Sequence, residues 1–172
     1  YSDQHYFFYY DGGYSGWSGE GGSSHEDDNS GIQRDVTQSD IASQYGLIAS
    51  AVTNASSSSS NRLSNIRLAL QMINGTCLKP GETFSFNETV GKRTTDRGFK
   101  MATAYSSGTV VEDVGGGICQ VSTTLFNAAV KADLQIVERH NHSLTVAYVD
   151  RGKDAAVNWN TQDLRFTNNS DD

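Results

Sequence analysis

The sequence lacks a long apolar run, is short of basic residues, and contains only two cysteines and one proline. No stretch reaches the roughly 18 apolar residues that a membrane-spanning helix needs, so we predict no transmembrane segment. Thirteen Lys and Arg residues stand against twenty Asp and Glu residues, for a formal charge of −7. This balance excludes the basic patch on which binding to nucleic acid or to an anionic membrane depends.

The negative charge is concentrated at the start of the chain. Residues 1–35 hold seven acidic residues and one basic residue, whereas residues 36–172 hold thirteen and twelve. The first ten residues are rich in aromatic side chains, which favour strands, and residues 11–35 have the Gly, Ser and acidic composition of a linker. We therefore predict an N-terminal extension over residues 1–35 and one domain of ordinary size over residues 36–172.

Two roles fit the aromatic part of the extension. It could add as a strand to the sheet of a neighbouring copy, which would make a homo-oligomer assembled through residues 1–17. Alternatively, it could pack on its own domain. The sequence does not decide between these roles.

Periodicity in residues 36–172 predicts an α+β fold. Apolar residues at helical spacing indicate helices over 37–52 and 61–73, the second ended by Asn74 and Gly75. The only proline lies in a turn over 79–82. Strands are expected over 83–86, 109–111, 135–138, 144–149, 155–159 and 163–167, while 99–105 fits either state. We expect N-terminal helices, a mostly antiparallel or mixed sheet, and a central helix over 118–132 that begins at a glycine-rich loop.

Cys119 is the strongest candidate for a functional residue, because it follows three glycines and falls in the first turn of a predicted helix. Unpaired N–H groups and the positive end of the helix dipole stabilise a thiolate at this position, and a thiolate is a nucleophile. The same N–H groups could stabilise an oxyanion during acyl transfer. Neighbouring groups are candidates for substrate binding: Gly116, Gly117, Gln120, Ser122 and Thr123. A buried structural cysteine is the alternative.

A cysteine nucleophile needs a base, and the domain contains two histidines, His140 and His142. Two residues apart on a strand, they would point to the same face. We favour His142 as the base, with Asp154 to orient its ring. The alternatives are a pair of surface histidines, or a zinc site formed with Cys119. We predict neither a metal nor another cofactor.

Two arginines, Arg93 and Arg139, are candidates for binding a peptide carboxylate, because a guanidinium pairs with a carboxylate through two hydrogen bonds. Ser143, beside His142, joins them as a substrate-binding candidate. The second cysteine, Cys77, has no glycine loop and no helix start beside it. We interpret it as a packing residue, although a disulfide between the two cysteines is the simplest reading in a secreted chain.

Several motifs resemble the VanW domain, in the same order and spacing over roughly residues 46–169. They are PGETFSFN (80–87), GxRT (91–94), GGGICQVSTTLxNAA (115–129), ERHxHS (138–143) and GxDAxV (152–157). The resemblance implies a bacterial cell-envelope protein, and some members act as cysteine L,D-transpeptidases. Cys119 would then attack stem peptides of peptidoglycan. Phe99 and Lys153 depart mildly from the usual pattern.

Two functions from different classes follow. The first is an extracellular, cell-wall-associated enzyme that acts on peptidoglycan or another extracellular peptide or glycan, with Cys119 as nucleophile and His142 as base. The second is a non-catalytic surface module, such as a filament subunit, assembled through the aromatic N-terminal segment. The Cys119–His142 pattern favours the first, and the unusual N-terminus favours the second.

Overall fold

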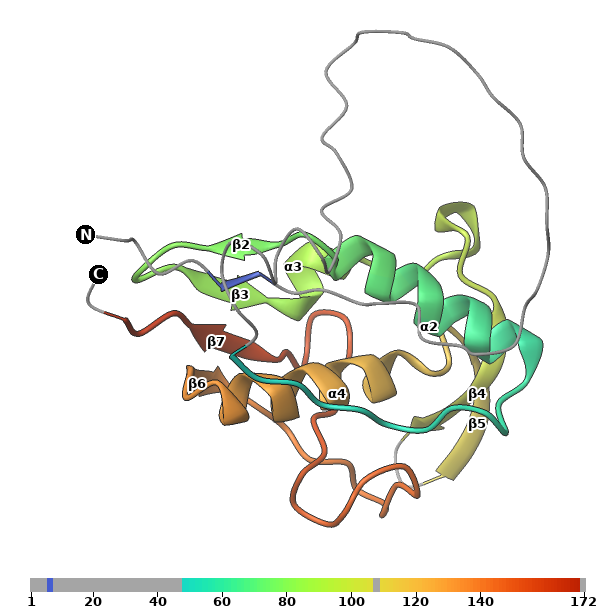
Figure 1. Cartoon of the computed structure of the whole chain (residues 1–172). Helices are drawn as coiled ribbons and strands as arrows, with labels where there is room; N and C mark the ends of the chain where they lie inside the picture. The colour runs from blue at the N-terminus through green and yellow to red at the C-terminus, as the bar shows by residue number, and fades with distance from the viewer. Residues whose placement is uncertain (1–5, 8–47, 107–108, 171–172) are drawn as a thin grey trace, which may run out of the picture.

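The computed structural model describes residues 6–7, 48–106 and 109–170. Its two long helices, α2 (Ser60–Ile73) and α4 (Ile118–Lys131), pack against each other. A three-stranded antiparallel sheet lies at one end of the helix pair and a two-stranded hairpin at the other (Figure 1). The predicted α+β class is confirmed, and α4 begins at the glycine-rich loop as expected.

Helix α2 begins where Ser59 caps it, its side-chain oxygen accepting a hydrogen bond from the Arg62 N–H. Its buried face includes Ile66, Ala69 and Ile73, which agrees with the predicted helical spacing. The helix ends at Asn74, and the following Gly75 has the positive φ that permits the chain to turn.

The three-stranded sheet has the order β3-β7-β6 and forms one wall of the core. Its strands are β3 (Thr83–Ser85), β7 (Arg165–Thr167) and β6 (Gln135–Glu138). Phe84 on β3 lies opposite Phe166 on β7, and their rings stack with centroids 4.9 Å apart. A short helix, α3 (Phe86–Val90), follows β3 and buries Phe86 and Val90 in the same core.

Residues 99–105, which the sequence assigned to neither helix nor strand, belong mostly to a strand. Residues Met101–Ser106 form β4, which pairs in antiparallel register with β5 (Thr109–Val114). A single 3₁₀ turn (Thr95–Arg97) precedes this hairpin. The hairpin leads directly into the glycine loop, because Gly115 follows the last residue of β5. The Gly115 N–H donates a hydrogen bond to the carbonyl of Lys100, just before β4.

The predicted helix over 37–52 is not confirmed where it can be seen. Residues 37–47 lie outside the described residues, and residues 48–52 have no regular secondary structure. Figure 1 shows this segment running across α4. Its polar groups bond to that helix: Thr53 to Thr124 at 2.7 Å, and the Ser50 carbonyl to Lys131 at 2.8 Å. Contacts with α4 replace the hydrogen bonds that a helix would make within itself.

The predicted strands over 144–149 and 155–159 are wrong. Residues 140–162 form a long loop whose only ladder contacts are two isolated bridges, His140 with Ala156 and Asn158 with Gln162. The reason is that side chains of α4 take the place of a neighbouring strand. Ser122 donates to the Ala155 carbonyl at 2.6 Å. Ala155 and Val157 are buried in the same core as Ile118 and Val121 of α4, and this alternate burial mimics the alternation of a strand.

The described part of the N-terminal extension is β1 (Tyr6–Phe7), which pairs with β2 (Cys77–Leu78) of the same chain. This arrangement agrees with packing on its own domain. The rest of residues 1–17 lies outside the described residues. Cys77 and Cys119 are both free thiols, so the disulfide is absent. No helix in the described ranges is long and apolar enough to cross a membrane.

Candidate active site

The glycine loop is shaped by close contacts with the hairpin and α2. A Cβ on Gly116 would collide with the carbonyl groups of Ala102 and Thr103 on β4, so no other residue fits there. Gly117 caps α4 with φ at 105°, a region that side chains other than glycine rarely adopt. These two glycines therefore fix the place where α4 starts, and with it the position of Cys119.

Asn65 of α2 locks this loop in place, and sequence reasoning missed it. Its fully buried amide donates to the carbonyls of Lys100 and Gly116, at 2.9 and 3.0 Å, and accepts from the Lys100 N–H at 2.8 Å. All three bonds join segments distant in sequence. The sequence did carry one signal for this role, because Asn65 is a polar residue next to the apolar positions of the predicted helix over 61–73.

Cys119 lies half-buried in the first turn of α4, as predicted. Its Sγ is 3.4 Å from the Val157 carbonyl, and its side chain also shares a hydrogen bond with the His142 ring. The N–H of Cys119 makes no hydrogen bond within the described residues. The residue therefore combines a thiol next to a base with a free backbone donor at a helix start.

His142 is oriented by Asp154. One carboxylate oxygen, Oδ2, lies 2.7 Å from the ring Nδ1 and accepts from the His142 backbone N–H at 2.6 Å. Because Asp154 occupies Nδ1, the Nε2 side of the ring is left to face Cys119. Cys119, His142 and Asp154 are thus arranged in the order of a nucleophile, a base and an orienting acid.

The ring's charge balance suits proton transfer. Burial disfavours a charged imidazole, but hydrogen bonds to Cys119 and Asp154 outweigh it and raise the pKa of His142 above its ordinary value. Burial also opposes ionisation of Asp154, yet the hydrogen bonds from His142 lower the pKa of this carboxyl. The pair therefore favours a negative carboxylate beside an imidazole that readily accepts a proton.

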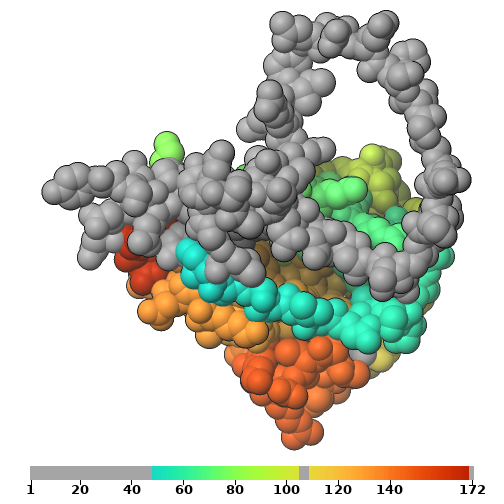
Figure 2. Space-filling view, in the orientation of Figure 1, coloured from blue at the N-terminus to red at the C-terminus, as the bar shows by residue number. Residues whose placement is uncertain are grey.

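The site opens into a cleft of about 730 Å³. The glycine loop, the middle of β4, the end of β5 and the 140–162 loop form its walls. The 140–162 loop projects from the lower side of the molecule in Figure 2. Three basic residues line the cleft together with Cys119 and His142: Arg62, Lys92 and Arg93. A cleft with a nucleophile and several cations is suited to a substrate that carries negative charge.

Arg93 is the best placed of these cations. Its Nη1 donates to Asn87 Oδ1 at 2.7 Å, and its guanidinium lies 5.5 Å above the Phe86 ring. Its Nη2 is buried and has no hydrogen-bond partner in the described residues. Burial lowers the pKa of Arg93, while charges on Cys119 and Asp163 act in the opposite direction. The side chain is held rigidly and still has one donor to offer.

Several predicted site residues do not reach the cleft. Ser122 and Thr123 are fully buried and bond to Ala155, so they hold the loop and do not face a substrate. Gln120 lines the cleft, but its amide already donates to Thr53 and to the Asn54 carbonyl. A helix turns its polar side chains toward different neighbours, so Ser122 and Thr123 are buried against the loop whereas Gln120 lies at the cleft wall.

Arg139 and His140 also have other partners. Arg139 donates to Asp154 Oδ1 at 3.0 Å and lies over the Phe126 ring, so it supports the carboxylate that orients His142. His140 bonds to Glu138 at 2.9 Å, away from Cys119. The two histidines do not share a strand face, because the chain leaves the strand after Glu138. Ser143 lines the cleft and is exposed.

Tyr148 is a cleft residue that sequence reasoning missed, because it was assigned to a strand. It lines the same cleft as Cys119 and His142. A metal was considered as the alternative for the cysteine and histidines. In residues 6–7, 48–106 and 109–170, no three His, Cys, Asp or Glu side chains gather closely enough to hold an ion.

Comparison with known proteins places this site in a family. The family model described as VanW like protein matches residues 61–172, which include every residue of the site. The chain belongs to the VanW family. It is 50% identical over 117 residues to the Uncharacterized protein YoaR of Bacillus subtilis (strain 168), covering 68% of this chain and 39% of that protein.

A second VanW relative is the Vancomycin B-type resistance protein VanW of Enterococcus faecalis (strain ATCC 700802 / V583). The two sequences are 32% identical over 116 residues, which is 64% of this chain and 42% of that protein. The chain thus spans about two fifths of the length of both relatives. No solved structure is significantly similar to it.

Proposed function

We propose that this VanW domain is a cysteine acyltransferase, an L,D-transpeptidase that acts on peptidoglycan stem peptides outside the cell. The observation that carries the proposal is the series Cys119–His142–Asp154 at the wall of an open cleft, in which Asp154 orients the His142 ring and the nearby Cys119 raises the pKa of that ring. A structural cysteine would need neither an oriented imidazole nor access to solvent. The family resemblance supports the substrate class, and the printed name of the enterococcal relative links that protein to vancomycin resistance.

The first half of the reaction forms a thioester. His142 takes the proton of the Cys119 thiol, and the sulfur attacks the carbonyl carbon of the L,D-peptide bond. A carbon–sulfur bond forms, and the carbonyl electron pair moves onto oxygen. When the oxyanion collapses, the carbon–nitrogen bond breaks, and the amine of the terminal D-residue leaves with the proton from His142.

The second half transfers the acyl group. An amine on the side chain of an acceptor stem gives a proton to His142 and attacks the thioester. The carbon–sulfur bond then breaks, and Cys119 recovers its proton from the imidazolium. The net result exchanges one amide for another, so the reaction needs neither a cofactor nor an oxidant. Water in place of the amine would give hydrolysis.

Arg93 gives the cleft a binding group for the donor. The terminal D-residue of a stem peptide ends in a carboxylate, Arg93 lines the same cleft as Cys119, and its buried Nη2 has no partner in the described residues. A guanidinium that is already held by Asn87 loses little entropy on binding such a group. This arrangement favours donors whose scissile bond lies one residue from the C-terminus.

The test is incubation of the protein with purified peptidoglycan fragments, followed by separation and mass analysis of the muropeptides. Wild-type protein is expected to produce cross-linked or trimmed stems, and C119A is not. Cys77→Ala serves as the matched control and is expected to behave as wild type. The same products from wild type and C119A, or no products from wild type, would contradict the proposal.

A further inference from the structure

The reaction above places a negative charge on the former carbonyl oxygen, and the site must stabilise that charge. The N–H of Cys119 is one donor available for it. Efficient acyl-transfer sites commonly provide more than one donor, and removing one costs about 10²–10³ in rate. A second group in this cleft is therefore expected to donate a hydrogen bond to the oxyanion.

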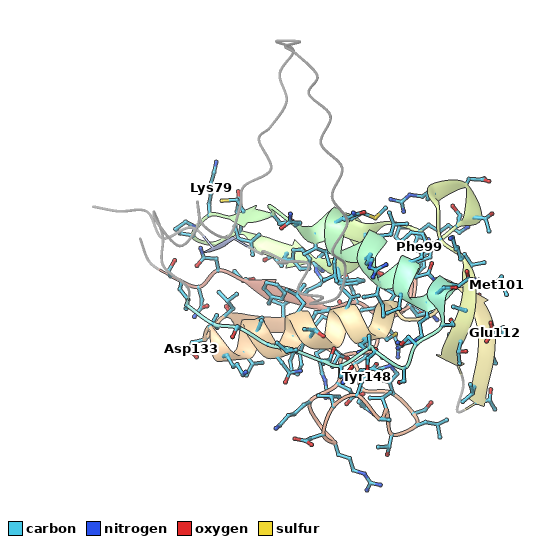
Figure 3. The ribbon with its side chains drawn as sticks, turned by 45° about the vertical axis from the view of Figure 1, so that its right-hand side comes forward. Lys79, Phe99, Met101, Glu112, Asp133 and Tyr148 are labelled. Atoms are coloured by element: carbon cyan, nitrogen blue, oxygen red, sulfur yellow. The ribbon has the colours of Figure 1, made fainter. Side chains whose placement is uncertain are left out.

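We propose that the Tyr148 hydroxyl is the second donor, completing an oxyanion hole with the Cys119 N–H. The inference rests on the proposed acyl transfer and adds a catalytic residue that no motif indicated. Tyr148 lies on the 140–162 loop, and Figure 3 places it between that loop and α4. Its side chain lines the same cleft as Cys119 and His142.

The phenol oxygen of Tyr148 has spare capacity to donate. It is buried and has no partner within hydrogen-bond distance in the described residues. The nearby Thr123 hydroxyl donates to the Ala155 carbonyl at 3.4 Å and accepts from the Ala155 N–H. The proton of Tyr148 is therefore left for another acceptor. A buried hydroxyl without an acceptor is costly unless a ligand supplies one.

The surroundings keep that proton on the oxygen. Burial raises the pKa of Tyr148, and negative charge at Cys119 raises it further, so the phenol remains neutral over the whole working range. The same Coulomb interaction places the phenol within electrostatic range of the reacting sulfur. A neutral donor close to the nucleophile is suited to an oxyanion that forms on the carbon bonded to that sulfur.

Two polar side chains next to Cys119 on α4 are already committed to other acceptors. The Gln120 amide donates both protons to Thr53 and Asn54, and the Ser122 hydroxyl donates to the Ala155 carbonyl. Arg93 keeps one free nitrogen, but its full charge is matched to the carboxylate of the substrate. Arg93 is therefore the competitor that an experiment must separate from Tyr148.

Two chemical probes isolate the oxyanion step without requiring the physiological substrate. p-Nitrophenyl acetate acylates a thiol through a tetrahedral oxyanion, and iodoacetamide alkylates the same thiol by displacement, with no oxyanion. Tyr148→Phe removes only the hydroxyl. We expect it to slow acylation of Cys119 by about 10²-fold, while the alkylation rate stays within about threefold. The peptidoglycan assay should show the loss in kcat rather than in KM.

Thr103→Val is the matched control, since it deletes a hydroxyl that lines the cleft but bonds to Glu112 on the hairpin. It should leave both probe rates unchanged. If Tyr148→Phe slows alkylation and acylation equally, the hydroxyl acts on the thiol and the proposal is overturned. Unchanged acylation by Tyr148→Phe, with a loss in Arg93→Gln, also overturns it. Inactivity of wild type toward peptidoglycan would instead refute the proposed function.

Discussion

Asp154 holds His142 at two points with a single oxygen, Oδ2, which lies 2.6 Å from the backbone nitrogen and 2.7 Å from ring Nδ1. The other oxygen pairs with Arg139 at 3.0 Å. Both the position of the loop and the orientation of the ring therefore depend on one buried carboxylate. Loss of the Asp154 carboxylate should therefore destabilise the 140–162 loop and misorient the His142 ring at the same time.

Asp154→Asn should make the fold less stable in a manner that depends on pH. Asp154 has a lowered pKa when folded, so its stabilisation is complete above about pH 3.9 and is lost as pH falls through the folded value. His142 has a raised pKa, so its stabilisation is complete below about pH 6.5 and is lost as pH rises through the folded value. The contribution of the pair is therefore greatest between these limits.

Urea unfolding of wild type and Asp154→Asn at pH 3, 5.5 and 9 measures this contribution. We expect a difference of about 2 kcal/mol at pH 5.5, typical of hydrogen bonds to charged groups, and smaller differences at both extremes. Asp150→Asn is the matched control, because Asp150 makes only an exposed ion pair with Lys153. A difference between wild type and Asp154→Asn that is constant across pH would show that the carboxylate and the imidazole are not coupled.

The two cysteines should differ strongly in reactivity. Cys119 has an imidazole partner and lies at a helix start, whereas burial and the charge of Glu82 raise the pKa of Cys77. Iodoacetamide at pH 7, with the sites resolved by peptide mass analysis, should modify Cys119 at least about tenfold faster. His142→Ala should remove most of that advantage, and His140→Ala should not. Equal rates at the two cysteines in wild type would contradict an activated thiol.

The sequence predicted the parts of the site that depend on short-range chemistry. A glycine run entering an apolar helix fixes where the helix begins, and this located Cys119 and its first-turn position. An aspartate just beyond the histidines was chosen correctly as the partner of the His142 ring. These assignments needed only local backbone preferences and the known pairing of imidazole with carboxylate.

The sequence did not predict that side chains of helix α4 would bond to the 140–162 loop in place of a neighbouring strand. Apolar alternation over 155–159 has the same period whether the partner is a strand or helix α4, so this part of the loop was assigned to a sheet, as was 144–149. That error concealed Tyr148 as a cleft residue. Asn65 shows the same limit, because its three hydrogen bonds reach residues 35 and 51 positions away.

Asn65→Leu should weaken the fold and disturb the glycine loop together. The substitution removes both hydrogen bonds to the Lys100 backbone and leaves the carbonyl of the buried Gly116 without this partner, at a cost of about 1–3 kcal/mol for the buried carbonyl. Thermal unfolding should therefore show a large fall in Tm. Asn61→Leu is the matched control, since Asn61 lies on the same helix and makes one exposed hydrogen bond to Met101. A Tm equal to that of this control would refute the role assigned to Asn65.

Arg93→Gln should change which substrates the site accepts. A neutral amide in place of the guanidinium cannot pair with a carboxylate, so KM for a stem tetrapeptide with a free C-terminus should rise by about tenfold or more, with a smaller effect on kcat. The same tetrapeptide with an amidated C-terminus lacks the matching charge and should be turned over poorly by wild type and variant alike.

The matched control for Arg93 is Lys92→Gln, which removes a positive charge from the same cleft at an exposed position. Solvent screens that charge, so KM should change by less than about threefold. If the two variants shift KM equally, the cleft attracts the substrate only through its general positive potential. If Arg93→Gln impairs the free and amidated peptides to the same extent, the guanidinium does not bind the carboxylate, and its free nitrogen serves another group of the substrate.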